Sequence, residues 1–276
     1  IKNKKFTIYS DKSHFKLKKN NLKFKLRNTN KILKIILKYN INVILHLASK
    51  IYPYSKMSDY KIERKNVIKP TIELLKRLNK NLTFIFVSSG GTVYGNRRYA
   101  KERDKLKVTN YLSKSKIQIE KSIIKYSKQN KFNYIILRPS NVYGFKKKMT
   151  SQHGLIENTI KKHMTQKRII LRNKGQDLRD YIYIGDFIKI IRTLIYKGVK
   201  NIILNISSNQ IYKTLDVVKK IEFLLSEKIK ITLKKKTSKD KISNISLSNK
   251  KLRSMLNIKF TMFDKGLKKT INSYLN

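Results

Sequence analysis

The stretch "LTFIFVSSGGTVYG", residues 82–95, joins a continuous apolar run to a run of small and hydroxylated residues. A short apolar run rich in β-branched and aromatic residues is typical of a strand buried on both faces, as strands of parallel sheets are. Open parallel sheets bind their ligands at the carboxyl ends of the strands. Small residues after this strand would leave room for a ligand, so the stretch predicts a parallel α/β sheet with a binding site at one edge.

The same arrangement occurs twice more along the chain. "NVILHLAS", residues 42–49, and "FNYIILRPSNVYG", residues 132–144, each join an apolar run to small or polar residues. One loop of this kind is weak support for a binding site, because Gly and Ser are common in any turn. Three such loops after three consecutive strands favour a shared site at the carboxyl edge of one sheet.

Strands and helices alternate in the first half of the chain. Strands are predicted at residues 6–10, 42–49, 82–89 and 132–140, and helices at residues 29–40, 58–79 and 112–130. Thr29 is a candidate cap of the first helix, and Pro70 either bends the second helix or lies near its first turn. This alternation predicts an α/β protein with a doubly wound parallel sheet.

The pattern loosens after about residue 145. Helices are predicted at residues 154–164, 185–196, 214–227 and 262–275, and strands at residues 168–172 and 201–208. The lysine-rich segment 233–241 is predicted to be a solvated loop.

Composition narrows the function classes. The chain has 276 residues, a formal net charge of +50 and 40% hydrophobic residues, so it can build a core. Lysines outnumber arginines 54 to 12 and are spread along the chain, so we favour a biased base composition of the gene over a specific nucleic-acid or membrane site. Cysteine is absent, the four histidines lack metal-ligand spacing, and no apolar run approaches the ~20 residues of a membrane span. No metal and no membrane partner are therefore expected.

Seven segments can be compared together: "NVILHLAS", "NVIKPTIELL", "FVSSGGTVYG", "SKSKIQIE", "YIILRPSNVYG", "GQDLRDYIYIGD" and "LNISS". In order and spacing they resemble the extended short-chain dehydrogenase/reductase family, in its branch of NAD-dependent nucleotide-sugar epimerases and dehydratases. The resemblance covers nearly the whole chain from about residue 25. The combination of "SSGGTVYG", "RPSNVYG" and "RDYIYIGD" is highly specific.

The resemblance implies a Rossmann domain at residues 1–144 that binds NAD, with NADP less favoured. It implies a smaller α+β domain at residues 145–276 that binds a nucleotide-diphosphate sugar, with about 183–208 returning to the first domain. A homodimer in the cytoplasm is also expected. In such enzymes a tyrosinate takes a proton from a sugar hydroxyl while hydride passes to the nicotinamide, and a neighbouring lysine lowers the tyrosine pKa from about 10.

The tyrosine–lysine pair departs from the family pattern, which is Tyr, three residues, Lys, and Glu four residues later. Glu120 matches the glutamate and makes Lys116 the lysine, which puts Leu112 at the tyrosine position. Tyr111 is one residue early. Either the start of the helix is shifted by one residue and Tyr111 still reaches the site as the base, or the base is lost and Tyr111 is an ordinary buried tyrosine.

The resemblance implies further site residues at the strand ends. Cofactor contacts are implied for Leu47, Ala48, Ser49, Asn66, Ser88, Ser89, Lys116 and Pro139, and substrate contacts for Asn141 and Arg179. Ser89 or Thr92 would position the substrate hydroxyl, since Gly90 occupies the usual place of that side chain. Arg179 would hold the diphosphate, or else form an ion pair with Asp177 or Asp180. Asn141 would contact substrate or shape its turn, and His46 is interpreted as a packed, hydrogen-bonded histidine.

Other departures concern the cofactor. The sequence contains no G-x-x-G-x-x-G segment, with which the family holds the pyrophosphate. We expect the chain to begin just before the family's second strand, to lack the first central strand and to bind dinucleotide weakly. Lys25 replaces an acidic residue that contacts adenine in the family. Asn66 is one place out of register with Thr71, as though Lys69 were inserted.

Three functions are compatible with these observations. The first is NAD-dependent epimerisation of a nucleotide-diphosphate sugar, of the UDP-sugar 4-epimerase type, because the acidic residues that dehydratases place at positions 90–92 are absent. The second is a catalytically impaired or decayed relative that keeps the fold. The third, suggested by charge alone, is a nucleic-acid-binding protein, which would show steep salt dependence.

Overall fold

The computed structural model describes residues 6–9, 25–144, 154–235, 237 and 243–275. The chain divides into two compact units. Unit 1 comprises Ile1–Val93, Leu106–Arg138 and Ile195–Leu204, and unit 2 comprises Tyr94–Lys105, Pro139–Leu194 and Asn205–Asn276. Each unit is described by itself.

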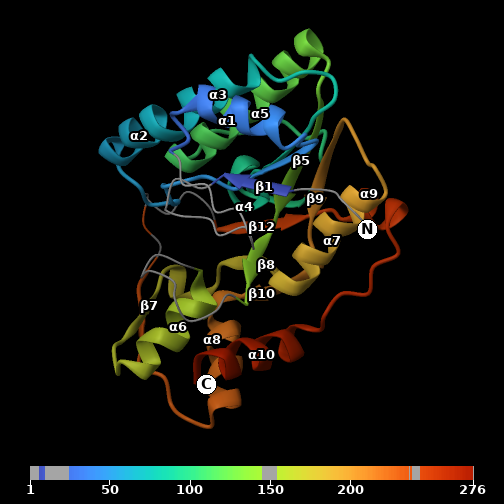
Figure 1. The fold of residues 1–276 in the computed structure, drawn as a ribbon. Coiled ribbons are helices and arrows are strands. Elements are labelled where there is room, and N and C mark those ends of the chain that lie inside the picture. Colours follow the sequence, from blue (N-terminus) through green and yellow to red (C-terminus); the bar gives the residue numbers. More distant parts are fainter. Residues whose placement is uncertain (1–5, 10–24, 145–153, 236, 238–242, 276) are drawn as a thin grey trace. The chain divides into compact units, whose positions relative to one another are not determined.

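Unit 1 is built on a five-stranded sheet. Its strands are β1 (Phe6–Tyr9), β2 (Val43–His46), β3 (Thr83–Val87), β5 (Asn133–Pro139) and β9 (Ile202–Ile206), in the order β1-β2-β3-β5-β9 (Figure 1). The pairings from β1 through β5 are parallel. Val43 is level with Thr83, and Thr83 with Asn133. The ends of these strands therefore reach the same edge, as the sequence predicted.

Helices cover one face of this sheet. They are α1 (Thr29–Lys38), α2 (Met57–Glu63), a π-helical turn (Arg64–Ile68), α3 (Lys69–Leu75) and α5 (Tyr111–Asn130); the short α4 (Gly90–Val93) follows β3. In Figure 1, α1, α3 and α5 lie together above the sheet. One buried cluster joins them to it, with Ile44, Phe84 and Ile136 from the strands and Ile32, Leu74 and Ile123 from the helices. In β3, Phe84 and Phe86 belong to this cluster and Ile85 does not, as the two-residue period of a strand requires.

Two helix predictions need correction. Thr29 does not cap α1, because the helix begins at Thr29 itself and Asn28 holds the cap position, without a side-chain capping bond. The helix predicted at 58–79 is α2, the π turn and α3 in succession, and it ends at Leu75. Pro70 is the second residue of α3, directly after the π turn, and so lies inside a continuous helical run.

Unit 2 contains a mixed sheet. Its strands β4 (Arg97–Ala100), β8 (Leu178–Tyr183), β10 (Gln210–Lys213) and β12 (Asn244–Leu247) follow the order β10-β8-β12-β4, and β6 (Asn141–Tyr143) also pairs with β8. Strands β7 (Ile169–Leu171) and β11 (Ile231–Leu233) form a separate parallel pair. The sequence predicted β7 but not the other strands, which are three to six residues long and carry little periodic signal.

The helices of the second half agree with the prediction. They are α6 (Leu155–Met164), α7 (Ile184–Tyr196), α8 (Thr214–Leu225) and α10 (Phe263–Leu275); a 3₁₀ turn (Asn173–Gly175) and α9 (Lys250–Met255) were not predicted. Tyr143, Tyr181 and Phe263 form the aromatic centre of the unit 2 core, with ring centroids 5.3–6.3 Å apart. The predicted loop 233–241 falls largely outside the described residues.

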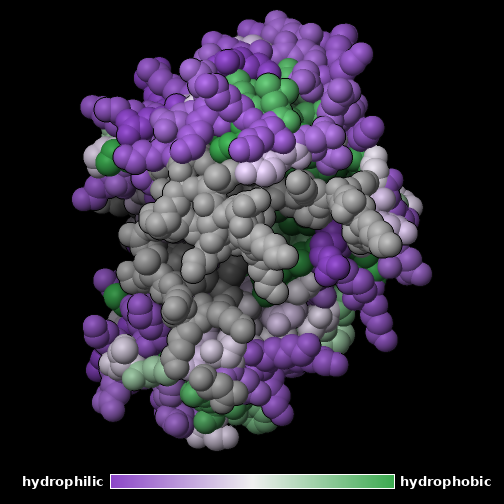
Figure 2. Space-filling model, viewed as in Figure 1, coloured by the Kyte–Doolittle hydropathy of each residue, from purple (hydrophilic) through white to green (hydrophobic). Residues whose placement is uncertain are grey.

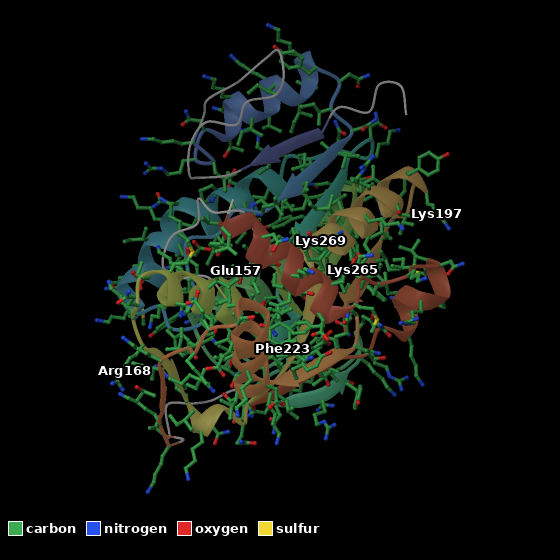
Figure 3. All side chains as sticks on the ribbon, turned by 90° about the horizontal axis from the view of Figure 1, so that it is seen from below. Glu157, Arg168, Lys197, Phe223, Lys265 and Lys269 are labelled. Carbon is green, nitrogen blue, oxygen red and sulfur yellow. The ribbon has the colours of Figure 1, made fainter. Side chains whose placement is uncertain are left out.

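Basic side chains project from both units. Figure 2 shows a largely hydrophilic surface over the helices of unit 1. Lys197 of unit 1 and Arg168, Lys265 and Lys269 of unit 2, which are labelled in Figure 3, are all exposed. Exposed basic residues therefore occur on both units. Among the described residues, no helix is long and apolar enough to cross a membrane.

Candidate functional site

The carboxyl ends of β2 and β3 bring several predicted residues to one edge of unit 1. After β2, Leu47 is exposed, Ala48 is buried and Ser49 is half-buried. After β3, Ser88 is buried, and its backbone N–H donates to the carbonyl oxygen of Leu137 at 2.7 Å. This is the edge at which an open parallel sheet binds its ligand.

Lys116 on α5 reaches the same edge. Its ammonium donates to the carbonyl oxygen of Val87, the last residue of β3, at 3.0 Å, and lies 5.0 Å from the centre of the Phe86 ring. Burial lowers the pKa of Lys116 to about 8, while the carboxylates of Glu63 and Glu120 act in the opposite direction. The side chain is therefore mostly a cation at neutral pH, held at the end of a central strand.

Glu120 links the lysine's helix to both neighbouring strands. Its carboxylate forms a buried ion pair with Arg138 of β5, with 2.6 Å between Nη2 and Oε2. The Ser88 hydroxyl donates to Glu120 Oε1 at 2.5 Å. Ser88, predicted as a cofactor contact, therefore directs its hydroxyl at Glu120, and Arg138 is a charged residue that the sequence analysis did not select.

Glu63 is the other buried carboxylate of this region, and the sequence analysis missed it. It accepts hydrogen bonds from Ser49 Oγ at 3.0 Å, from the backbone N–H of Lys50 at 2.8 Å and from Ser115 Oγ at 3.5 Å. Burial raises its pKa, opposed by the Lys50 amide, Lys116 and the two hydroxyls. Glu63 follows Tyr60 by three residues and so shares its helix face, but the local sequence does not show that this face is buried.

His46, at the end of β2, is a packed histidine, as interpreted from the sequence. It is fully buried, its Nε2 lies 2.8 Å from the hydroxyl of Thr71, and its ring lies against Phe84 and Phe86. Burial and the charge of Lys116 lower its pKa to about 3. It is therefore neutral at physiological pH.

Tyr111 lies on a different side of α5 from Lys116. It is the first residue of the helix, after the capping residue Asn110, and its ring stacks on Tyr60 with centroids 5.3 Å apart. Five residues at about 100° each place Tyr111 and Lys116 about 140° apart around the helix. Among the described residues, no hydrogen bond or ion pair joins these two side chains.

The remaining predicted residues of this edge are placed as follows. Thr92 is buried in α4, and its hydroxyl donates to the carbonyl oxygen of Ser89 at 3.4 Å. Ser89 itself is half-buried, as is Asn66 in the π turn, and Pro139 is buried at the end of β5. Lys25 is exposed in the turn before α1.

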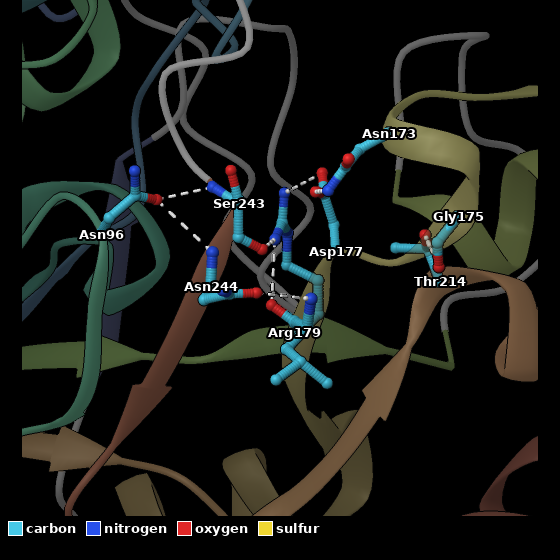
Figure 4. A network of polar contacts seen from close by, with 9 residues as sticks. Asn96, Asn173, Gly175, Asp177, Arg179, Thr214, Ser243 and Asn244 are labelled. Carbon is cyan, nitrogen blue, oxygen red and sulfur yellow. Dashed lines mark hydrogen bonds and ion pairs between the residues drawn. The ribbon is translucent and has the colours of Figure 1, made fainter. Parts of the chain in front are cut away.

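Arg179 belongs to a polar network in unit 2 (Figure 4), and Asn141 lies in the same unit. Arg179 pairs with the carboxylate of Asp177 at 3.2 Å and donates to the carbonyl oxygen of Ser243. The ion pair of Arg179 with Asp177, which the sequence analysis gave as the alternative to diphosphate binding, is therefore present. Asn141 donates to the carbonyl oxygen of Asp180 at 2.9 Å and so ties β6 to β8.

A model of the NAD dependent epimerase/dehydratase family matches residues 4–207. The chain belongs to this family. It is 30% identical over 205 residues to the dTDP-4-dehydro-6-deoxyglucose reductase of Escherichia coli, covering 70% of this chain and 62% of the reductase. It is 28% identical over 187 residues to a putative UDP-glucose 4-epimerase of Methanocaldococcus jannaschii, and the match covers 65% of this chain and 61% of that protein. The matched region thus spans about three-fifths of each relative.

Solved structures of related enzymes share the fold. The UDP-glucose 4-epimerase of Thermus thermophilus, in complex with NAD, has a TM-score of 0.82 at 17% identity, covering 91% of this chain and 83% of that one. A dTDP-glucose 4,6-dehydratase from Bacillus anthracis, also in complex with NAD, has a TM-score of 0.76 at 21% identity. The match covers 92% of this chain and 79% of the dehydratase. The predicted α/β fold with a Rossmann-like parallel sheet is confirmed.

Proposed function

We propose that this chain is a NAD-dependent enzyme that epimerises a nucleotide-diphosphate sugar, of the UDP-sugar 4-epimerase type, through transient oxidation to a keto sugar. The observation that carries the proposal is the buried ammonium of Lys116, 3.0 Å from the carbonyl oxygen of Val87 at the carboxyl end of β3, in a chain of this family. It puts a fixed positive charge at the edge where an open parallel sheet binds ligands.

The residues around Lys116 fit the nicotinamide side of NAD. An ammonium has three donor hydrogens, and among the described residues Lys116 uses one of them, on Val87; the others can serve hydroxyl oxygens. The proposed contacts in unit 1 are Leu47, Ala48, Ser49, Asn66, Ser88, Ser89 and Lys116. NAD, when bound, supplies the hydride acceptor. Thr92 and Ser89 are proposed to orient the reacting sugar hydroxyl.

The sugar nucleotide is assigned to unit 2. Arg179 and Asn141 are the proposed contacts, and a guanidinium suits diphosphate oxygens because of its planar fork. Its present partner, Asp177, would then hold the guanidinium in position. A homodimer remains part of this proposal.

Tyr111 is the residue proposed to take the proton from the sugar hydroxyl. Tyr111→Phe removes only the hydroxyl and keeps the ring that stacks on Tyr60. We expect this variant to fold and to bind NAD like the parent chain while losing turnover, since a missing general base typically lowers the rate by about 10²–10⁴-fold. Unchanged turnover would remove Tyr111 from the mechanism.

A catalytically impaired relative is the second candidate. The stack of Tyr111 on Tyr60, turned away from Lys116, favours it. Such a protein would keep the fold and show no turnover in the assay below.

The purified chain should be incubated with NAD and UDP-galactose, and the products followed by NMR at sugar position 4. We expect UDP-glucose to accumulate. Parallel reactions with dTDP-glucose, and with dTDP-4-dehydro-6-deoxyglucose plus NADH, identify dehydratase or reductase activity instead. Lys116→Met, which fills the same buried space without the charge, is the matched control. An absence of NAD binding and of all three reactions would refute the proposal and favour the impaired relative.

A further inference from the structure

We propose that Asn173 is a positioning residue of Arg179, which it orients through the carboxylate of Asp177. The role rests on the proposed function only in that Arg179 is there the contact of the diphosphate. All three residues belong to unit 2. The sequence analysis selected Arg179 but not Asn173.

Asn173, Asp177 and Arg179 form a continuous row of polar contacts (Figure 4). The amide Nδ2 of Asn173 donates to Asp177 Oδ1 at 2.7 Å, and Asp177 Oδ2 lies 3.2 Å from Arg179 Nη2. The carboxylate thus has one of these two partners at each oxygen. Asp177 is buried. Its carboxylate, fixed at Oδ1 by the amide, therefore keeps Oδ2 directed at the guanidinium.

The guanidinium of Arg179 is also held at its other terminal nitrogen. Nη1 donates to the carbonyl oxygen of Leu178 at 2.9 Å and to that of Ser243. The Ser243 N–H in turn donates to Asn96 Oδ1 at 2.5 Å. The Arg179 side chain is still 19% exposed. A guanidinium that is fixed at two nitrogens and partly exposed meets phosphate oxygens in one orientation, which reduces the entropy lost on binding.

The backbone that carries Asn173 is unusual. The φ angles of Asn173, Lys174 and Gly175 are 48°, 49° and 75°, so the whole 3₁₀ turn is left-handed. Asparagine adopts this region more readily than lysine does. The turn is held from outside, because Thr214 Oγ1 donates to the carbonyl oxygen of Gly175 at 3.0 Å. Backbone strain of this kind clusters at functional sites, and here the strained turn directs the Asn173 amide at Asp177.

The test removes the amide and keeps the turn. Asn173→Gly can retain the left-handed backbone, since glycine adopts it at no steric cost, but loses the hydrogen bond to Asp177. We expect the dissociation constant of UDP, measured by calorimetry without NAD, to rise by about tenfold, the size of one lost hydrogen bond to a charged group. A folded Asn173→Gly chain with the parent affinity for UDP would overturn the proposal.

Lys174→Gly is the matched control. It makes the same substitution at the next left-handed position, where the side chain is exposed. At about 0.15 M salt, which screens exposed charges, this variant should bind UDP within about twofold of the parent chain. Equal losses of affinity in Asn173→Gly and Lys174→Gly would assign the effect to the turn and overturn the role of the amide.

A second readout follows Arg179 itself, without any nucleotide. Arginine side chains are labelled with ¹⁵N, and the Nε signal of Arg179 is assigned as the one lost in Arg179→Lys. In Asn173→Gly its heteronuclear NOE should fall, because the Asp177 carboxylate can then turn, whereas Lys174→Gly should keep the parent value. Asn173→Asp has the same shape and should act in the same direction by repelling Asp177, so it decides the question if Asn173→Gly does not fold. An unchanged NOE would overturn the proposal.

The two proposals fail separately. A parent chain that binds no UDP would refute the assignment of Arg179 to the diphosphate, while a lower NOE in Asn173→Gly would leave Asn173 as the residue that orients Arg179. A parent chain that converts UDP-galactose, with UDP affinity and NOE unchanged in Asn173→Gly, would keep the proposed function and refute the role of Asn173.

Discussion

Asp180 should make unit 2 less stable as the pH rises. The residue lies on β8 and is 1% exposed. Its Oδ2 accepts hydrogen bonds from Ser207 Oγ at 2.6 Å and from the backbone N–H of Leu247 at 3.1 Å. Its Oδ1 is buried with no hydrogen-bond partner among the described residues. Burial raises its pKa from 3.8 to about 7, although its hydrogen-bonding neighbours, Ser207 and the Leu247 amide first among them, act in the opposite direction.

The raised pKa fixes the sign and the size of the effect. Below pH 3.8 the carboxyl is protonated in both the folded and the unfolded chain. Between pH 3.8 and about 7 the folded chain keeps the proton that the unfolded chain has lost, so the free energy of unfolding falls as the pH rises. A difference of about three pH units at 1.36 kcal/mol each amounts to about 4 kcal/mol, fully lost above pH 7. Asp180→Asn keeps the shape of the side chain, but its amide does not titrate.

The assay is urea unfolding of the parent chain and of Asp180→Asn at pH 5 and pH 8. About two of those three pH units fall in this window, so the parent should lose about 3 kcal/mol more than the variant does. Asp264→Asn is the control, because Asp264 is an exposed residue paired with Lys220. If parent and Asp180→Asn show the same change between the two pH values, Asp180 is not a buried protonated carboxyl.

Three further outcomes are expected. Arg138→Met strands the buried carboxylate of Glu120 and should cost about 3–5 kcal/mol in urea unfolding, most of which Glu120→Leu in the same chain restores; equal losses in the single and double variants would contradict this. Because the pKa of Lys116 is lowered to about 8, unfolding free energy should rise by about 3 kcal/mol between pH 8 and 10.5, and this rise should be absent in Lys116→Met. Arg179→Lys keeps the charge but loses the fork shared by Asp177 and a backbone carbonyl, so unit 2 should lose about 1–2 kcal/mol in thermal unfolding, and an unchanged midpoint would count against that network.

Long apolar runs made the parallel sheet of unit 1 predictable from sequence. β2, β3 and β5 are nearly continuous in apolar residues, because both faces of a central parallel strand are buried. The mixed sheet of unit 2 was not predictable in the same way. Its strands are short, and β4 has three exposed residues of four, so its existence depends on pairing with β12, more than 140 residues away.

The site shows the same division. The sequence by itself determined that Lys116 lies on a long helix, that Ser88 follows a buried strand and that His46 ends another, since each depends on local period and on position relative to a strand. Only the tertiary structure decided that Glu63 and Arg138 are the charged partners of this edge. Glu63 is buried because Ser49, Ser115 and the Lys50 amide converge on it from two other segments. Such convergence has no local signature, because a carboxylate is stable in a protein interior only when the complete fold supplies its donors and an opposite charge.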